Sequence, residues 1–175
     1  MRFNGIYVPL VTPFNADGSL DVETLKILTE SFIEKGVAGL VACGTTGEYY
    51  TLNETERETV LKTVAAIGKG RITLIAGIND LSTEGACRRA KEAAALGYEA
   101  FMLAPPAYSL PDQAGVIAHY ETVAQATDLP IIMYNFPARV GIEIEYETVV
   151  HLAKNPNIAG LKESSGDFSR ALQLL

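Results

Sequence analysis

Short apolar segments recur along the 175-residue chain, each followed by a polar or Gly/Pro-rich turn and then by a helical pattern. They are apolar throughout rather than alternating with polar positions, which is typical of parallel strands covered on both faces. Successive segments begin about thirty residues apart, the length of one strand–helix unit. The predicted strands are residues 5–11, 38–43, 72–76, 100–104, 130–134 and 158–162.

Helix signals occupy the segments between these strands. Asn53 followed by Glu56 is a capping-box pattern, and Gly97 ends an alanine-rich helix as a C-terminal cap. No linker, charge block or low-complexity tract interrupts the alternation, so residues 1–175 are expected to form a single domain. Helices are predicted to begin at Asp21, Asn53, Ser82, Asp112 and Glu145.

Alternation of strand and helix at this period leaves two main architectures, a doubly wound open sheet or a (β/α)8 TIM barrel. The G-x-G-x-x-G dinucleotide fingerprint is absent after the first strand, which argues against the doubly wound sheet. Polar residues follow several strands at their C-terminal ends, as in a barrel that builds its site from many loops. A complete barrel needs about 250 residues. We therefore expect about the first six βα units of an α/β barrel, truncated after the sixth strand.

The composition narrows the class of protein. With 48% hydrophobic and 20% charged residues, the chain has enough apolar material for a core. A net charge of −7 argues against nucleic acid and anionic membrane surfaces as partners. No apolar run of about 18 residues and no signal peptide is present. Cys43 and Cys87 lack metal-binding spacing, so reduced cytoplasmic thiols and no metal site are expected.

Lys162 is the candidate nucleophile. It ends an apolar segment that reads as a buried strand, and desolvation favours the neutral form of an amine. A neutral lysine forms Schiff bases with carbonyl substrates. The alternative is a strand-end lysine that extends its ammonium group into water.

Candidate substrate ligands follow the second and fifth strands. The loop that contains Thr45, Thr46 and Gly47 offers backbone N–H groups and hydroxyls to a small carboxylate or phosphate, or is an ordinary Gly-rich turn. Tyr134 ends the fifth strand, where it is either a proton relay or a core aromatic. Arg139, in the Pro/Gly loop that follows, either clamps a carboxylate or lies solvated at the surface.

Tyr108 lies in a loop with three prolines after the fourth strand. A tyrosine held rigidly at a loop tip is suited to reach another subunit, although turn packing explains it equally well. Together with Lys162, Tyr134 and the two threonines, it is predicted to converge at one barrel mouth. That combination favours catalysis over the separate structural interpretations.

Three motifs carry a resemblance to a known family. They are Gly44-Thr45-Thr46-Gly47-Glu48, Tyr134-Asn135-Phe136-Pro137 and Gly160-Leu161-Lys162-Glu163, supported by the opening segment 8–14. The chain resembles the dihydrodipicolinate synthase / N-acetylneuraminate lyase family of pyruvate-dependent class I aldolases. The resemblance covers the whole chain but only part of a family member.

The resemblance implies that Lys162 forms a Schiff base with pyruvate while the turn Thr45-Thr46-Gly47 holds the pyruvate carboxylate. Tyr134, Thr46 and Tyr108 would form a proton relay, with Tyr108 supplied across a tight dimer interface. It also implies no metal or organic cofactor, and a homo-oligomer at full length.

Arg139 favours the synthase branch of the family, because it matches the arginine that binds the carboxylate of the aldehyde substrate. That aldehyde would be L-aspartate 4-semialdehyde, giving 4-hydroxy-tetrahydrodipicolinate in lysine biosynthesis. Ala107 and Leu110 depart from the synthase pattern. These two residues leave open the alternative that the chain is an aldolase or dehydratase acting on a 2-keto-3-deoxy sugar acid or N-acetylneuraminate. A further alternative is an inactive fragment that lacks the last strands of the pocket wall.

Overall fold

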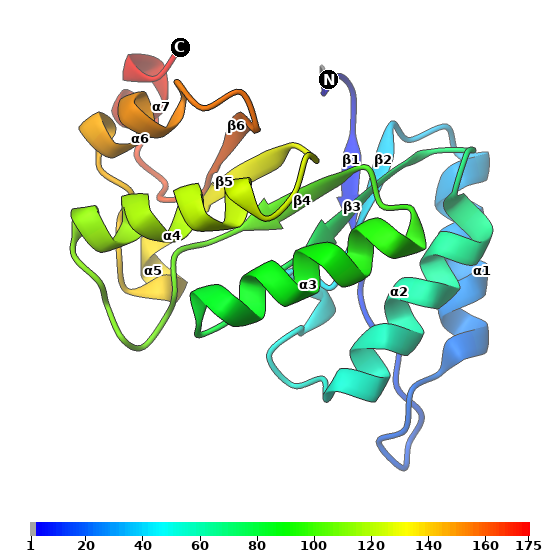
Figure 1. The fold of residues 1–175 in the computed structure, drawn as a ribbon. Coiled ribbons are helices and arrows are strands. Elements are labelled where there is room, and N and C mark those ends of the chain that lie inside the picture. The colour runs from blue at the N-terminus through cyan, green and yellow to red at the C-terminus, as the bar shows by residue number, and fades with distance from the viewer. Residues whose placement is uncertain (1–2) are drawn as a thin grey trace. The chain divides into compact units, whose positions relative to one another are not determined.

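The computed structural model describes residues 3–175 and divides into two compact units, whose elements are labelled in Figure 1. The N-terminal unit contains residues 3–78 and Glu92–Phe101. The C-terminal unit contains Asn79–Lys91 and Met102–Leu175. The boundaries cut through a helix and a strand rather than through a linker, and the expectation of a single domain stays a prediction.

The described residues contain six strands whose order in the sheet follows the chain. The pairs β1–β2, β2–β3 and β5–β6 are parallel. A doubly wound sheet reverses its strand order at a switch point, so the sequential order agrees with a barrel. The strands are β1 (Tyr7–Pro9), β2 (Gly39–Ala42), β3 (Thr73–Gly77), β4 (Ala100–Leu103), β5 (Ile131–Asn135) and β6 (Ile158–Glu163). The bounds of the last five are within one residue of their predicted segments, and β1 is two residues shorter than predicted at each end.

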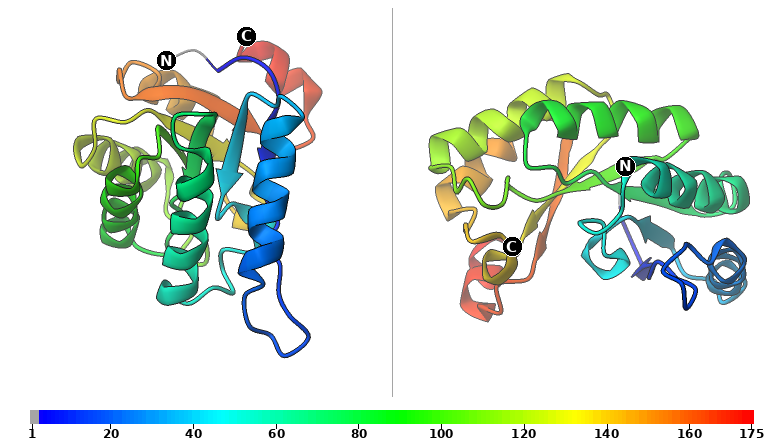
Figure 2. Two further views of the ribbon diagram at one scale, coloured as in Figure 1. Left: turned by 90° about the vertical axis from the view of Figure 1, so that its right-hand side faces the viewer. Right: turned by 90° about the horizontal axis from the view of Figure 1, so that it is seen from below.

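In the N-terminal unit, α1 (Val22–Glu34) and α2 (Glu54–Gly68) pack side by side (Figure 2). The predicted capping box is confirmed. The Asn53 side chain accepts from the Glu56 amide at 2.9 Å, and the Glu56 carboxylate accepts from the Asn53 amide at 2.9 Å. A local sequence pattern therefore fixes where α2 begins, and its apolar residues Val60, Leu61 and Val64 lie in the core.

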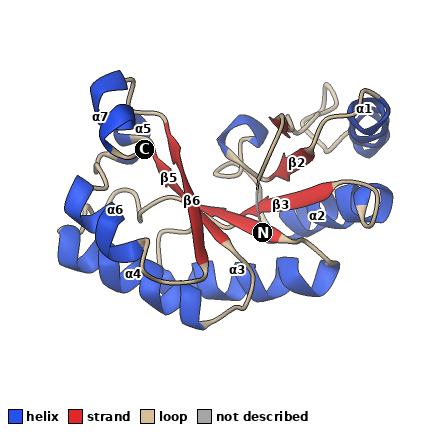
Figure 3. Ribbon diagram, turned by 90° about the horizontal axis from the view of Figure 1, so that it is seen from above, coloured by secondary structure: helices blue, strands red, loops and turns tan. Residues whose placement is uncertain are grey.

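In the C-terminal unit, α4 (Gln113–Gln125) and α6 (Tyr146–Leu152) lie on the same side of the β5–β6 pair (Figure 3). Gln113 joins the two helices, because its side chain donates to the Glu143 carbonyl at 2.9 Å and accepts from the Thr148 hydroxyl at 2.7 Å. The remaining helices are α3 (Thr83–Leu96), which crosses between units, α5 (Pro137–Val140) and α7 (Phe168–Gln173).

Two expectations from the sequence are wrong. The loop that carries Arg139 is not irregular throughout, because it contains the one-turn helix α5, with Pro137 at its start and Gly141 (φ 84°) at its end. The strand β6 is not buried along its length, because Ala159 and Gly160 are exposed. As the last strand in the order, β6 pairs along one edge only, with β5. Within residues 3–175, no helix combines the length and apolar character needed to cross a membrane.

Candidate active site

Lys162 and Tyr134 form the centre of the candidate site. They are register partners on β6 and β5, and the Lys162 Nζ atom lies 4.1 Å from the centroid of the Tyr134 ring. This is within the range of a cation–π contact. The ring is 5% exposed and Lys162 is half-buried. The amine therefore lies against an aromatic face, and the two residues predicted to act together are in contact.

The cause of this contact is the pairing of parallel strands. Residues directly opposite each other on adjacent strands project to the same face of a sheet. The Tyr134 ring is itself held by Phe136, whose ring centroid lies 5.7 Å away. Lys162 is half-buried, and the Tyr134 ring covers its amine on the β5 side. The expectation of a neutral amine stays a prediction.

Arg139 is exposed in the last turn of α5, five residues after Tyr134. The backbone amide of Arg139 donates to the Phe136 carbonyl at 3.0 Å, so the backbone of Arg139 is held within the helical turn. The structure thus places a guanidinium in the same unit as Lys162. Its role in binding a carboxylate stays a prediction.

Tyr108 is 93% exposed and has a left-handed backbone, with φ 69°. A non-glycine residue in this region is uncommon, and Leu110 of the same loop also has a positive φ of 47°. The loop therefore presents Tyr108 to solvent rather than against Tyr134 or Lys162. Its contribution across a subunit interface stays a prediction.

The predicted carboxylate-binding turn forms the 3-10 helix η1 (Thr45–Gly47) in the N-terminal unit. The Gly47 amide donates to the Gly44 carbonyl at 3.0 Å. The amides of Thr45 and Thr46 precede this first intrahelical bond and are directed out of the turn. Thr46 is exposed and Thr45 half-buried. Because the other site residues belong to the C-terminal unit, their convergence with this turn stays a prediction.

Two residues that sequence reasoning missed shape this turn. Thr12 donates its hydroxyl to the Gly47 carbonyl at 2.7 Å. A Cβ atom on Gly77 would lie 2.2 Å from the Cys43 carbonyl oxygen, so only glycine permits this approach of the backbones. A glycine at the end of a strand can indicate such close contact, whereas nothing in the sequence singles out Thr12.

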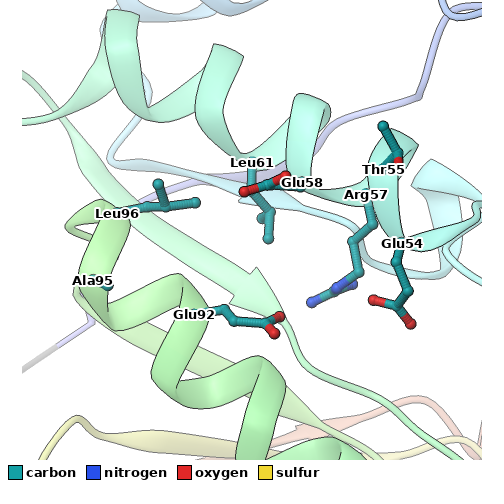
Figure 4. A pocket seen from close by; sticks show the side chains of 8 residues that line it. All are labelled: Glu54, Thr55, Arg57, Glu58, Leu61, Glu92, Ala95 and Leu96. Atoms are coloured by element: carbon teal, nitrogen blue, oxygen red, sulfur yellow. The ribbon is translucent and has the colours of Figure 1, made fainter.

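A cavity of about 430 Å³ lies in the N-terminal unit, and its lining includes none of the predicted site residues (Figure 4). Its polar lining comes mainly from acidic side chains of α2 and α3 around the buried Arg57. In the described part of the chain, no group of three or more His, Cys, Asp or Glu side chains is placed to hold a metal ion. The lining residues are Glu54, Thr55, Arg57, Glu58, Leu61, Glu92, Ala95 and Leu96.

The dihydrodipicolinate synthetase family matches residues 2–175 of the chain. The chain belongs to this family. It is 42% identical to the 4-hydroxy-tetrahydrodipicolinate synthase of Alcanivorax borkumensis over 170 residues, which cover 97% of this chain and 58% of the relative. The family predicted from the three motifs is therefore confirmed.

Solved structures of family members match the fold. The 4-hydroxy-tetrahydrodipicolinate synthase of Methylacidiphilum fumariolicum SolV superposes with a TM-score of 0.95 at 37% identity, covering 99% of this chain and 58% of that one. The chloride-inhibited dihydrodipicolinate synthase of Acinetobacter baumannii, complexed with pyruvate, gives 0.94 at 41% identity, covering 97% and 58%. The predicted (β/α)-barrel class is confirmed, in a chain that spans about 58% of the length of these relatives.

Proposed function

We propose that this family member condenses pyruvate with an aldehyde through a Schiff base on Lys162. The observation that carries the proposal is the contact between the Lys162 amine and the Tyr134 ring, at paired positions near the C-terminal ends of two parallel strands. Relatives named 4-hydroxy-tetrahydrodipicolinate synthase support the same chemistry. L-Aspartate 4-semialdehyde is the aldehyde that this likeness favours, and lysine biosynthesis the setting.

The chemistry proceeds by covalent catalysis. The neutral Lys162 amine attacks C2 of pyruvate, and loss of water gives an imine. The protonated imine withdraws electrons from C3, so that loss of a C3 proton leaves an enamine whose C3 attacks the aldehyde carbon. Attack of the product amine or of water on the imine then releases the lysine. The imine itself accepts the electrons, so the scheme requires no metal or organic cofactor.

The other predicted site residues act around this centre. Tyr134 relays protons during imine formation, together with Thr46 and with Tyr108 from a neighbouring subunit of a homo-oligomer. Thr45, Thr46 and Gly47 bind the pyruvate carboxylate, and Arg139 binds the carboxylate of the aldehyde. We propose a cytoplasmic location for the enzyme, in line with the two free cysteines, Cys43 and Cys87.

Reduction with borohydride in the presence of pyruvate tests the proposal. The chain is expected to gain the mass of pyruvate less water plus two hydrogens, located at Lys162 by peptide mapping. Lys162→Ala removes the adduct, whereas Lys154→Ala, at an exposed lysine after α6, retains it. An adduct that persists in Lys162→Ala would refute the assignment.

A second candidate is cleavage or dehydration of a 2-keto-3-deoxy sugar acid or of N-acetylneuraminate. It is supported by Ala107 and the half-exposed Leu110, which change the loop after β4 from the synthase pattern. Both candidates share a Schiff base between Lys162 and the C2 carbonyl of a 2-keto acid. Measuring kcat/KM for condensation with L-aspartate 4-semialdehyde beside cleavage and dehydration of a panel of sugar acids distinguishes them, because the ratio of these values gives the substrate preference.

A further inference from the structure

Two successive cross-strand pairs occupy the ends of β5 and β6. Tyr134 lies opposite Lys162, and Asn135 lies opposite Glu163. Because side chains alternate between the faces of a sheet, the second pair projects away from the amine. The Asn135 side chain is fully buried, and its Nδ2 atom donates to the two carboxylate oxygens of Glu163 at 3.0 and 2.9 Å.

Asn135 also fixes the segment that carries Arg139. Its Oδ1 atom accepts from the amide of Ile144 at 3.0 Å, which closes residues 136–143 into a loop. Its backbone carbonyl accepts from the amide of Ser164 at 2.9 Å, which extends the β5–β6 pairing past the end of β6. One buried amide side chain thus connects the end of β6 with the far end of the loop.

Glu163 is held on its other side by Arg170 of α7. The Arg170 Nε atom donates to Glu163 at 3.0 Å, and the Ser165 amide donates to the same carboxylate at 2.7 Å. Arg170 is 9% exposed and donates through Nη2 to the Ile144 carbonyl. We call these three side chains the Asn135–Glu163–Arg170 cluster. Its buried charges are paired and hydrogen-bonded, the condition under which buried ions are tolerated.

The carboxylate of the cluster is held in its ionised form. Burial by itself raises the pKa of Glu163, but the hydrogen bonds from Ser165, Asn135 and Arg170 outweigh burial and leave the pKa below its usual value. Glu163 therefore acts as an acceptor for three donors at once and has no proton to exchange with the amine on the opposite face.

We propose that Glu163 is a positioning residue for the reaction, one that keeps Lys162 against the Tyr134 ring and, through Asn135 and Arg170, fixes the far end of the segment that carries Arg139. The proposal rests on the proposed function, in which Lys162 is the nucleophile. Glu163 is the residue next to Lys162, so a shift of the β6 backbone at Glu163, which the cluster anchors, also displaces Lys162. Because the same cluster closes the loop of Arg139, one set of hydrogen bonds sets the geometry for both substrates. Misplacement of a reacting group by about 1 Å costs about a hundredfold in rate.

The test compares Glu163→Gln with Glu147→Gln, which makes the same chemical change at an exposed position of α6. The rate of borohydride trapping is measured over a range of pyruvate concentrations. For Glu163→Gln we expect the limiting rate to fall about tenfold or more with less than about threefold change in the half-saturating pyruvate concentration. Glu147→Gln is expected to match the parent chain.

An exchange of the pair provides the rescue experiment. In the double variant Asn135→Asp with Glu163→Gln, the carboxylate and the amide change strands while their mutual hydrogen bond is kept. We expect this variant to recover most of the trapping rate that Glu163→Gln loses. A purely structural role for each residue alone predicts additive losses instead, and that result would overturn the proposal.

A second readout does not depend on pyruvate. The labelling rate of Lys162 by an amine-selective reagent, relative to Lys154, is expected to change by about threefold or more in Glu163→Gln. If the parent chain traps no pyruvate but the labelling of Lys162 changes in Glu163→Gln, the proposed function fails and the positioning role stands.

If the rates of trapping and of labelling in Glu163→Gln both stay within about twofold of those of the parent chain, the positioning role is wrong. Should Glu163→Gln not fold, Arg170→Lys gives the same comparison, since it loses the donor to Ile144.

Discussion

The Tyr134 ring supports the Lys162 amine on the β5 side, at 4.1 Å from the ring centroid. The contact uses the face of the ring, whereas the proposed proton relay uses the hydroxyl. Positioning and proton transfer are therefore separable in a single side chain.

Replacement of Tyr134 by Phe and by Leu separates these two contributions. Phe keeps the aromatic face and removes the hydroxyl, so we expect the rate of condensation to fall about a hundredfold or more, the usual size of a lost acid–base catalyst. Leu removes both and is expected to lose, in addition, the placement of Lys162. Steady-state rates and the labelling rate of Lys162 measure the two effects. Equal Lys162 labelling in the Phe and Leu variants would contradict a positioning role for the ring.

His119 is expected to make the protein less stable in mild acid. The side chain is 3% exposed, its Nδ1 atom lies 2.9 Å from the Thr83 hydroxyl, and its Nε2 atom has no partner among the described residues. Burial lowers the pKa of His119 from 6.5 to about 4, against an opposing effect of Asp80. The unfolded chain then binds a proton that the folded chain does not, so stability is full above about pH 6.5 and is lost as the pH falls.

The resulting loss of unfolding free energy between pH 7 and pH 5 is about 2 kcal/mol. Urea unfolding at the two pH values measures it. His119→Gln is expected to abolish most of the difference. Glu163 does not account for it, because its lowered pKa places its own loss of stabilisation below this window. An unchanged pH dependence in His119→Gln would show that another group is responsible.

Two glycines of the η1 turn differ in their tolerance of a side chain. A Cβ atom on Gly47 would lie 2.9 Å from the Leu10 carbonyl oxygen and 3.2 Å from the Thr12 hydroxyl, whereas one on Gly44 would meet only Val41 at 3.6 Å. Gly47→Ala is therefore expected to cost about 1–3 kcal/mol of unfolding free energy, as overpacking does, and Gly44→Ala much less. Urea unfolding of the two variants measures both free-energy losses. Equal losses in Gly47→Ala and Gly44→Ala would contradict the steric argument.

Local features of this fold were predictable from sequence, and features set by distant contacts were not. The capping box of Asn53 depends on residues three apart, and it was predicted correctly. The one-turn helix α5 was missed although Pro137 and Gly141 carry its start and stop signals. The exposure of β6 depends on how many strands pair with it, which its own residues do not encode.

In the candidate site, too, the chemistry of single residues was predictable from sequence, whereas contacts between distant residues were not. Lys162 and Tyr134 were identified from their chemistry, and the structure confirms that they are in contact. The positioning role proposed for Glu163 was not predicted, because it depends on Arg170 being buried. Arginine is usually exposed, and only the tertiary structure shows this one paired with Glu163, the residue next to Lys162.

Arg139 provides the sharpest distinction between the two candidate reactions. Its guanidinium is exposed at the end of α5 and is free of the cluster that anchors the loop. If it binds the carboxylate of the aldehyde, Arg139→Ala removes a charge-assisted pair worth about 1.5–3 kcal/mol, or about 10- to 150-fold in the KM for that substrate. Arg139→Lys keeps the charge but loses the two-pronged geometry, so an intermediate KM is expected. Trapping of pyruvate at Lys162 should be unchanged in both variants, because that step precedes the aldehyde. An unaltered KM for L-aspartate 4-semialdehyde in Arg139→Ala would remove the argument for the synthase reaction and favour the sugar-acid alternative.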